Sequence, residues 1–475
     1  MSIDSRSWLR PAVICIAAIT LLRLVLLGFD RTDLYVDEAQ YWLWGQEFAF
    51  GYYSKPPLIA WVIGAITTLA GSDAPFWVRM PGAVLHGITA LILAALAARM
   101  FGARFAVWVA VAYATLPMVA LGSLLMSTDT VMAPFFAAAL YFHRRLIEQP
   151  TVRFAAFAGA AAGIAFLAKY AALYFAIGVI LAAILRRDQR IGWGHAGAMV
   201  LAFCVVISPN IVWNLSHGLT TFSHTADNVG WVRRENPLVG LNLPGLATFF
   251  FSQFAVMGPV VFAALLASFA RPKHRQALAA FAIPALVIVC VQAFLDKAYA
   301  NWAVAAYFAG VILAMAVLEQ YPRLRLASLA VNGMVCLILP LLVIFPTIQQ
   351  NDTPLLARQL GRADLSRQII ALADHAGKVP IYADNRDVLA DLFYTGRNNG
   401  LMVYAPRPIG RPQNHYEQRY PLPQGLTGLI LMVTKTAPAC AAAGDVAALQ
   451  TKGGAYEGDG LAAYLIDAGC LNVAG

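Results

Sequence analysis

Charged residues are scarce in this chain: only 12% of its 475 residues are Asp, Glu, Lys or Arg, whereas 60% are hydrophobic. A soluble domain is about one quarter charged and about half apolar. The composition therefore excludes an ordinary soluble protein and predicts one that crosses a membrane several times. The sequence also has no Gly-rich nucleotide-binding loop and no Cys or His spacing typical of metal sites. These absences argue against an enzyme that binds a nucleotide through such a loop.

Cysteine is also sparse, and its six residues divide into two groups. Four lie in apolar segments, where cysteine behaves as a small core residue. The other two, Cys440 and Cys470, lie in a polar C-terminal region. They would form a disulfide if that region is in an oxidising compartment.

Long apolar segments bounded by charged residues recur along the first 346 residues. About 20 apolar residues in a helix cross the hydrocarbon of a bilayer, so we predict a polytopic α-helical membrane protein with about eleven transmembrane helices. The first segment has no small-residue cleavage site behind it and is expected to be a retained span. The segments are 12–29, 81–98, 105–121, 131–146, 154–168, 171–185, 196–209, 246–269, 277–295, 303–318 and 326–345.

One further apolar segment, residues 58–70, does not fit this count. It is short for a span and follows Pro56 and Pro57. Counting it as a crossing would also invert every later loop. We therefore predict an interfacial or re-entrant helix within the first loop, residues 30–79.

Basic residues are concentrated in alternate loops. If the N-terminus is cytoplasmic, every loop on its side carries two or more Lys or Arg residues, which is the positive-inside pattern. The first 346 residues hold 23 basic and 14 acidic residues, whereas the remaining residues hold 11 of each. The basic excess thus indicates membrane orientation and not a nucleic-acid partner. We expect a multi-pass protein of a bacterial inner membrane with its C-terminal region in the periplasm.

Residues 347–475 are more polar and alternate strand-like with helix-like runs. The strand-like runs are 379–383, 401–404 and 428–433, and the helical ones are 386–394 and 441–449. We predict a small periplasmic α/β domain, closed by loops rich in Gly and Pro, beside a transmembrane catalytic domain of residues 1–346.

The unusual polar residues all fall on the predicted outer side of the membrane. Loops that are distant in sequence but share one membrane face can form a single interfacial site. The candidates are Asp37, Glu38, Tyr52, Tyr53, Lys55, Asp129, Lys169, Tyr170, His217, His224, Lys297, Asn301 and Trp302.

Carboxylates and ammonium groups at a membrane surface suit the transfer of a sugar from a polyprenyl phosphate. Asp37 with Asp129 could position or deprotonate the acceptor hydroxyl. Lys55, Lys169 and Lys297 could stabilise the departing phosphate through charge-assisted hydrogen bonds. Because the leaving group is a lipid phosphate, neither a metal nor another cofactor is chemically required.

The motifs DEAQYW, YYSKPP, STDT, LAKYAAL, SPNIVWNLSHG and ANWAVAAY occur in an order that resembles one family. It is the bacterial branch of the dolichyl-phosphate-mannose protein mannosyltransferase-like glycosyltransferases, which has the GT-C fold and includes the aminoarabinose transferases of lipid A. The resemblance implies that Asp37 is the catalytic base, that Lys55 binds the donor phosphate near Tyr52 or Tyr53, and that Asp129 completes the site. Ser54 stands where the aminoarabinose transferases have a Glu linked to a metal.

Simpler interpretations of these residues remain open. Asp37 and Glu38 could cap a helix, and one of the pair could be structural while the other is catalytic. Asp129 could cap the next span, and Lys55 or Lys169 could anchor a span end. Of the remaining candidates, Tyr170 and Lys297 would contact the lipid or its phosphate. The candidates for acceptor contacts are His217, His224, Asn301 and Trp302.

Several functions are compatible with the sequence. The first is transfer of a sugar to lipid A or lipopolysaccharide, and the second is O-glycosylation of a protein. A secondary transporter is less consistent, because the charges gather at one face and no repeated half is visible. A non-catalytic envelope assembly factor is a further alternative. In the enzyme interpretation, we expect the C-terminal region to shape acceptor access and to hold none of the reacting groups.

Overall fold

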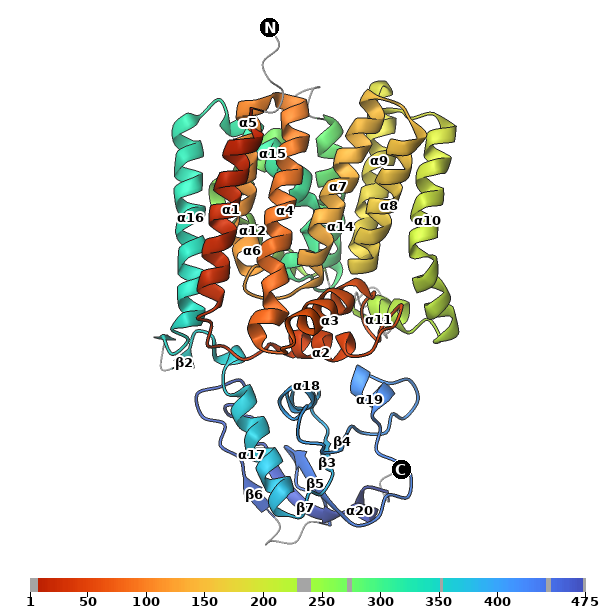
Figure 1. Ribbon diagram of the computed structural model, residues 1–475, viewed down its shortest axis with the longest axis vertical. Helices are drawn as coiled ribbons and strands as arrows, with labels where there is room; N and C mark the ends of the chain where they lie inside the picture. The colour runs from red at the N-terminus through yellow and green to blue at the C-terminus, as the bar shows by residue number, and fades with distance from the viewer. Residues whose placement is uncertain (1–6, 229–240, 271–275, 351–352, 441–445, 473–475) are drawn as a thin grey trace.

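The computed structural model describes residues 7–228, 241–270, 276–350, 353–440 and 446–472. A bundle of long helices forms one part, and a smaller part with a β-sheet follows it (Figure 1). The N-terminus lies at one end of the bundle, and the sheet-containing part lies beyond the other end. The first loop contacts three helices of the C-terminal region.

All eleven predicted apolar segments are helical. By length and composition, five helices of the described chain can each cross a membrane, or six if one bent pair counts as a single span. Several of the others are shorter apolar helices of 10–17 residues. The bundle helices are α1 (Leu9–Leu27), α4 (Pro75–Phe101), α5 (Ala103–Ala114), α6 (Pro117–Leu121), α7 (Thr128–Glu148), α8 (Val152–Ala168), α9 (Tyr174–Leu185), α10 (Trp193–Ser216), α12 (Leu243–Met257), α13 (Pro259–Phe269), α14 (Gln276–Leu295), α15 (Ala305–Leu318) and α16 (Pro322–Ile344).

The centre of the bundle is helix α15. Each of its 14 residues is buried, as expected for a helix that is apolar on every side. It packs against α13 and α14. One predicted span is bent, because α12 and α13 meet at 113°. Gly258 lies at this break with φ of 87°, a backbone conformation that a residue with a Cβ rarely adopts.

The first loop contains two helices, α2 (Val36–Gly45) and α3 (Leu58–Ala70). They lie at the end of the bundle that faces the C-terminal region (Figure 1), where the sequence predicts a helix that does not cross the membrane. Their backbones approach closely, because a Cβ on Gly64 would lie 2.3 Å from the carbonyl oxygen of Gly45. Glycine at both positions therefore allows the two helices to pack directly together.

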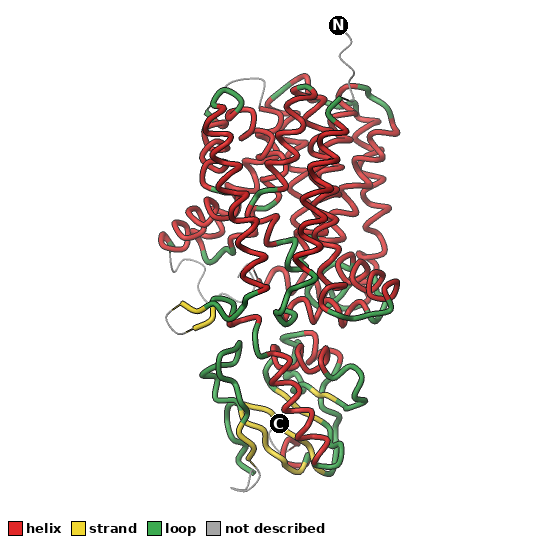
Figure 2. The backbone as a smooth tube through the Cα atoms, turned by 60° about the vertical axis from the view of Figure 1, so that its left-hand side comes forward, coloured by secondary structure: helices red, strands yellow, loops and turns green. Residues whose placement is uncertain are grey.

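The C-terminal region is built on a five-stranded mixed sheet with the strand order β4-β3-β5-β7-β6. Strand β3 is parallel to β4 and β5, whereas β7 is antiparallel to β5 and β6. The strands are β3 (Ile381–Ala383), β4 (Val403–Tyr404), β5 (Leu429–Thr434), β6 (Val446–Ala448) and β7 (Ala462–Asp467). The accompanying helices are α17 (Arg362–His375), α18 (Arg386–Thr395), α19 (His415–Arg419) and α20 (Gly469–Asn472). Figure 2 shows the strands gathered on the side of this region away from the bundle.

Three predicted strands and the helix at 386–394 are present. The predicted helix at 441–449 is wrong where the structure describes it, because residues 446–448 form strand β6 and residues 441–445 lie outside the described part. Strand β6 pairs with β7, so sheet pairing outweighs the helical preference of an Ala-rich segment. The sequence analysis also missed α17 and β7. Cys440 and Cys470 form a disulfide with their Cα atoms 6.2 Å apart.

Candidate active site

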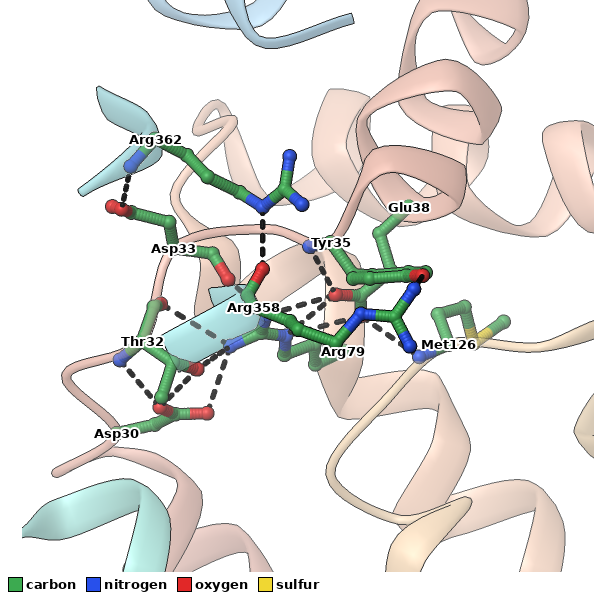
Figure 3. Close-up of polar contacts among 9 residues, drawn as sticks. All are labelled: Asp30, Thr32, Asp33, Tyr35, Glu38, Arg79, Met126, Arg358 and Arg362. Carbon is green, nitrogen blue, oxygen red and sulfur yellow. Dashed lines mark hydrogen bonds and ion pairs between the residues drawn. The ribbon is translucent and has the colours of Figure 1, made fainter. Parts of the chain in front are cut away.

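Helix α2 carries two adjacent carboxylates in its first turn, Asp37 and Glu38. Glu38 is 2% exposed and accepts hydrogen bonds from Arg79 Nε at 3.0 Å and Nη2 at 2.8 Å. It also accepts from the backbone N–H groups of Tyr35 and Met126, each at 2.9 Å. Both carboxylate oxygens are therefore engaged by the protein itself (Figure 3).

Arg79 extends this network to the segment that leads into α2. Its Nη1 lies 2.8 Å from Asp30 Oδ2, and its Nη2 donates to the carbonyl oxygen of Asp33 at 2.7 Å. The Glu38–Arg79 pair thus joins α2, α4 and the loop before α7 (Figure 3). This geometry argues against the predicted catalytic role of Glu38 and favours a structural one, because neither oxygen faces a free space.

Asp37 has different surroundings. Its side chain is 46% exposed, and its Oδ1 lies 2.6 Å from Nη2 of Arg386, at the start of α18. The same Arg386 nitrogen donates to Gln40 Oε1 at 3.0 Å. Within the described residues, Oδ2 of Asp37 has no hydrogen-bond partner. One oxygen of Asp37 is therefore held by the C-terminal region while the other is available to a substrate.

Asp129 forms a second charged cluster at the start of α7. Both of its oxygens accept from Lys169 Nζ, at 2.7 and 2.8 Å, and Oδ2 also accepts from Asn301 Nδ2 at 2.8 Å. The N-cap of α7 is Ser127, whose hydroxyl accepts from the backbone N–H of Thr130. The alternative that Asp129 caps this helix is therefore wrong, and three of the predicted site residues meet here.

Lys55 differs from these paired groups. Among the described residues, its ammonium group has no hydrogen-bond or ion-pair partner. Burial lowers the pKa of Lys55, with Lys169 and Arg386 adding to the effect while Asp37 and Asp129 oppose it. Both carboxylates are therefore close enough to Lys55 to influence its charge. A partly buried ammonium without a partner is suited to bind an anion.

The predicted tyrosines belong to the scaffold of the first loop. Tyr52 stacks on Trp44 with ring centroids 5.0 Å apart, and its hydroxyl donates to the Glu47 carbonyl oxygen at 2.7 Å. Tyr53 donates to the Pro412 carbonyl oxygen at 2.9 Å. Their hydroxyls are therefore already bonded, which argues against donor-phosphate binding through them. Both rings line a cavity of about 740 Å³ that also borders α10 and α19.

Tyr170 also has a packing role. Its ring stacks on Phe222 with centroids 4.9 Å apart, and its hydroxyl donates to Asn210 Oδ1 at 3.3 Å. The side chain thus connects the start of α9 with α10 and α11 (Thr220–Asn228). Binding of the lipid phosphate by Tyr170 stays a prediction.

The two predicted histidines do not come together. His217 is exposed and stacks on Trp213 at 4.1 Å, whereas His224 lies against the ring of Tyr53 at 5.1 Å. Burial, helped by Lys55 and Arg386, lowers the pKa of His224 to about 4, so this side chain is neutral at pH 7. No group of three or more His, Cys, Asp or Glu side chains within the described ranges could hold a metal ion.

Two further candidates lie apart from the Asp129 cluster. Lys297 is exposed, and within the described part of the chain no hydrogen bond or ion pair joins it to the cluster. The Trp302 ring contacts Tyr299 edge-on at 5.5 Å. Of the DKAYANW segment, only Asn301 is seen to reach the charged site.

Arg386 is the residue that the sequence analysis missed. It lies in the segment YADNRDVLADLFYTGR, and no pattern within that segment points to Asp37. The expectation that the C-terminal region holds no group at the site does not account for this contact. Burial tends to lower the pKa of Arg386, but Asp37 together with Tyr416 and Asp387 raises it, and the net shift is upward. Arg386 is therefore charged wherever Asp37 is ionised.

Residues 54–213 match the family of dolichyl-phosphate-mannose-protein mannosyltransferases. The chain is 41% identical over 473 residues to the lipid A galacturonosyltransferase RgtD of Rhizobium johnstonii, covering 97% of this chain and 99% of that protein. The fold resembles crystal structures of ArnT from Cupriavidus metallidurans in the apo state and bound to undecaprenyl phosphate. The TM-scores are 0.59 and 0.58, the sequence identity is 16% in each case, and each match covers 88% of this chain and 92% of that protein.

Proposed function

Because this chain belongs to the GT-C glycosyltransferase family that includes the lipid A galacturonosyltransferase RgtD, we propose that it transfers galacturonic acid from a polyprenyl phosphate to lipid A. It is a multi-pass membrane glycosyltransferase, and its near full-length similarity to RgtD is the reason for proposing the same sugar and acceptor. Sequence analysis alone left the sugar open. The absence of the metal-linked Glu at Ser54 supports a sugar other than aminoarabinose.

The observation that carries this proposal is the meeting of opposite charges at one end of the bundle. Asp37, Lys55, Asp129 and Lys169 come from four separate segments of the chain, and the field at Lys55 includes the other three. Of these four residues, Lys55 is the one whose side chain has no partner among the described residues. A phosphodiester is the complementary ligand, because it brings a single negative charge to an unpaired ammonium group.

The site can then carry out an inverting transfer. Asp37 accepts the proton of the acceptor hydroxyl through its open oxygen. The acceptor oxygen forms the new bond to the anomeric carbon while the bond from that carbon to the phosphate oxygen breaks. The lipid phosphate leaves with the electron pair and gains negative charge, which Lys55 stabilises. Asp129 holds Lys169 beside this centre, and Asn301 fixes the carboxylate of Asp129.

We also infer the position of the acceptor and of the membrane. The aromatic cavity lined by Trp44, Tyr52 and Tyr53 offers ring faces on which acceptor sugars can pack. The positive-inside pattern supports a cytoplasmic N-terminus in a bacterial inner membrane. The Cys440–Cys470 disulfide supports a periplasmic location for residues 347–475, beside a catalytic domain of residues 1–346.

The test is a reconstituted transfer assay. Purified protein in liposomes receives polyprenyl-phosphate galacturonic acid and lipid A, and mass spectrometry follows the acceptor. We expect the addition of one hexuronic acid by the wild type and none by Asp37→Asn. Transfer to an added Ser/Thr-rich peptide and not to lipid A would instead support protein O-glycosylation. Alkaline phosphatase fused to the C-terminus should be active if this region is periplasmic.

A further inference from the structure

We propose that Arg386, supplied by the C-terminal region, is a positioning residue for Asp37, so that sugar transfer requires this region to be docked on the first loop. The inference rests on the proposed function, in which Asp37 is the base. It assigns to residues 347–475 a part in the reaction itself, beyond selection of the acceptor. The argument follows from how α18 is placed, from what Arg386 contacts and from what the contact contributes to stability.

The start of α18 fixes the position of Arg386. The side chain of Asn385 accepts from the backbone N–H groups of Asp387 at 2.8 Å and Val388 at 3.4 Å, which is an N-cap. Arg386 is therefore the first residue of the helix. On α2, Asp37 and Gln40 are three residues apart and share one face. Their side-chain oxygens converge on Nη2 of Arg386, at 2.6 and 3.0 Å.

Other contacts are sufficient to dock the C-terminal region. Asp33 of the first loop accepts from the backbone N–H groups of Arg362 at 2.9 Å and Ala363 at 3.3 Å, so it caps α17 from outside that helix (Figure 3). The Tyr394 hydroxyl donates to the Asp73 carbonyl oxygen at 2.5 Å. These buried or partly buried contacts bring α17 and α18 onto the first loop without Arg386.

The Arg386–Asp37 pair itself adds little to stability. The two side chains are 37% and 46% exposed, and exposed ion pairs of this kind contribute little to stability. Its consequence is geometric, because it holds one oxygen of Asp37 and so limits the directions in which the other can point. A base that is oriented by a third group is a recurring feature of catalytic sites. Arg386 therefore acts on the reaction through Asp37.

The experiment compares Arg386→Gln and Arg386→Lys with Arg397→Gln. Arg397 is the matched control, because it also joins the C-terminal region to the first loop, at 3.8 Å from the Asp73 carboxylate, but does not contact Asp37 and does not line the aromatic cavity. In the liposome assay we expect Arg386→Gln to lower kcat by about 10²-fold with the donor KM almost unchanged, since small displacements of a catalytic group cost this much. Arg386→Lys keeps the charge and should restore part of kcat.

The Tm of all three variants should match that of the wild type, and Arg397→Gln should keep its kcat. A wild-type kcat for Arg386→Gln would overturn the inference. So would equal losses for Gln and Lys accompanied by a lower Tm, because that pattern indicates a purely structural role.

A second readout does not depend on the identity of the sugar. Deletion of the gene in its own strain should remove one sugar mass from an envelope lipid, and plasmid copies of each variant are tested for restoring it. Arg397→Gln should restore the mass, and Arg386→Gln should not. If the restored mass is not a hexuronic acid, the proposed function fails while the inference about Arg386 is still tested. Restoration by Arg386→Gln to the wild-type level would overturn the inference alone.

Discussion

Asp37 and Glu38 are adjacent in the sequence, yet the structure gives them opposite surroundings. Replacing each carboxylate by its amide should therefore separate stability from activity. Asp37→Asn should abolish most transfer and leave the fold intact, whereas Glu38→Gln should destabilise the fold. The prediction is sharp because both substitutions make the same chemical change, from a carboxylate to an amide, at adjacent positions.

The expected size of the Glu38→Gln effect follows from its partners. Every group that contacts the Glu38 oxygens is a donor: Arg79 Nε and Nη2, and the N–H groups of Tyr35 and Met126. An amide supplies one acceptor oxygen and one NH2 group. On one side, the NH2 group would therefore face hydrogen-bond donors and leave them without an acceptor. Breaking one side of a buried ion pair costs about 3–5 kcal/mol. Glu38→Gln should lower the free energy of unfolding by a similar amount.

Asp37→Asn has a much smaller structural cost. Its ion pair with Arg386 is partly exposed, and loss of such a pair costs less than about 1 kcal/mol. Loss of a general base, however, lowers the rate by about 10²–10⁴-fold. Asp37→Asn should therefore have a low kcat with a nearly unchanged Tm, whereas Glu38→Gln should have a low Tm.

The assay is thermal unfolding of the detergent-solubilised protein by size-exclusion chromatography, alongside the transfer assay. Asp37→Asn should keep the wild-type Tm, and Glu38→Gln should lower it clearly. A Glu38→Gln protein with a wild-type Tm and no activity would refute the structural role and return Glu38 to the catalytic residues. Glu38→Ala is the second test, because it removes both oxygens and should be at least as unstable.

Three other substitutions test separate parts of the structure. Lys55→Met should lower kcat/KM by about 10–100-fold through a lower kcat together with a higher donor KM, because hydrogen bonds to charged groups contribute about 1.5–3 kcal/mol. An unchanged kcat/KM would contradict phosphate binding there. Gly64→Ala should lower Tm, because the new Cβ would lie 2.3 Å from the Gly45 oxygen and overpacking costs about 1–3 kcal/mol. Gly71→Ala is the control for backbone strain alone, because φ is positive at Gly71 and no atom lies within 4 Å of the added Cβ. Burial raises the pKa of Asp391 from its ordinary 3.8 to about 7. Between these values the folded chain keeps a proton that the unfolded chain loses, so the Tm of the wild type should fall with rising pH more steeply than that of Asp391→Asn; parallel curves would contradict this.

Much of the architecture could be predicted from the sequence, because it depends on properties that a one-dimensional pattern records. Apolar runs long enough for a bilayer become helices, since backbone polar groups in lipid must bond within their own segment. The strands at β3, β4 and β5 likewise follow from local composition. The residues from Ala441 onward show the limit: pairing of β6 with β7 decided the structure of residues 446–448.

The sequence analysis predicted which charged residues lie on one membrane face better than it predicted how they are arranged. Clustering of acidic and basic residues on one membrane face follows from topology, and it correctly brought Asp129, Lys169 and Asn301 together. Which carboxylate of the DE pair is buried could not be predicted, because that depends on Arg79 arriving from another helix. Nor could the Arg386 contact, which spans 349 residues of sequence. Ion pairs form wherever packing brings two side chains within a few ångströms, and no local pattern encodes that distance. The sequence alone thus determined a membrane-embedded helical protein with charges at one face, and only the tertiary structure decided which of those charges are engaged and which are open.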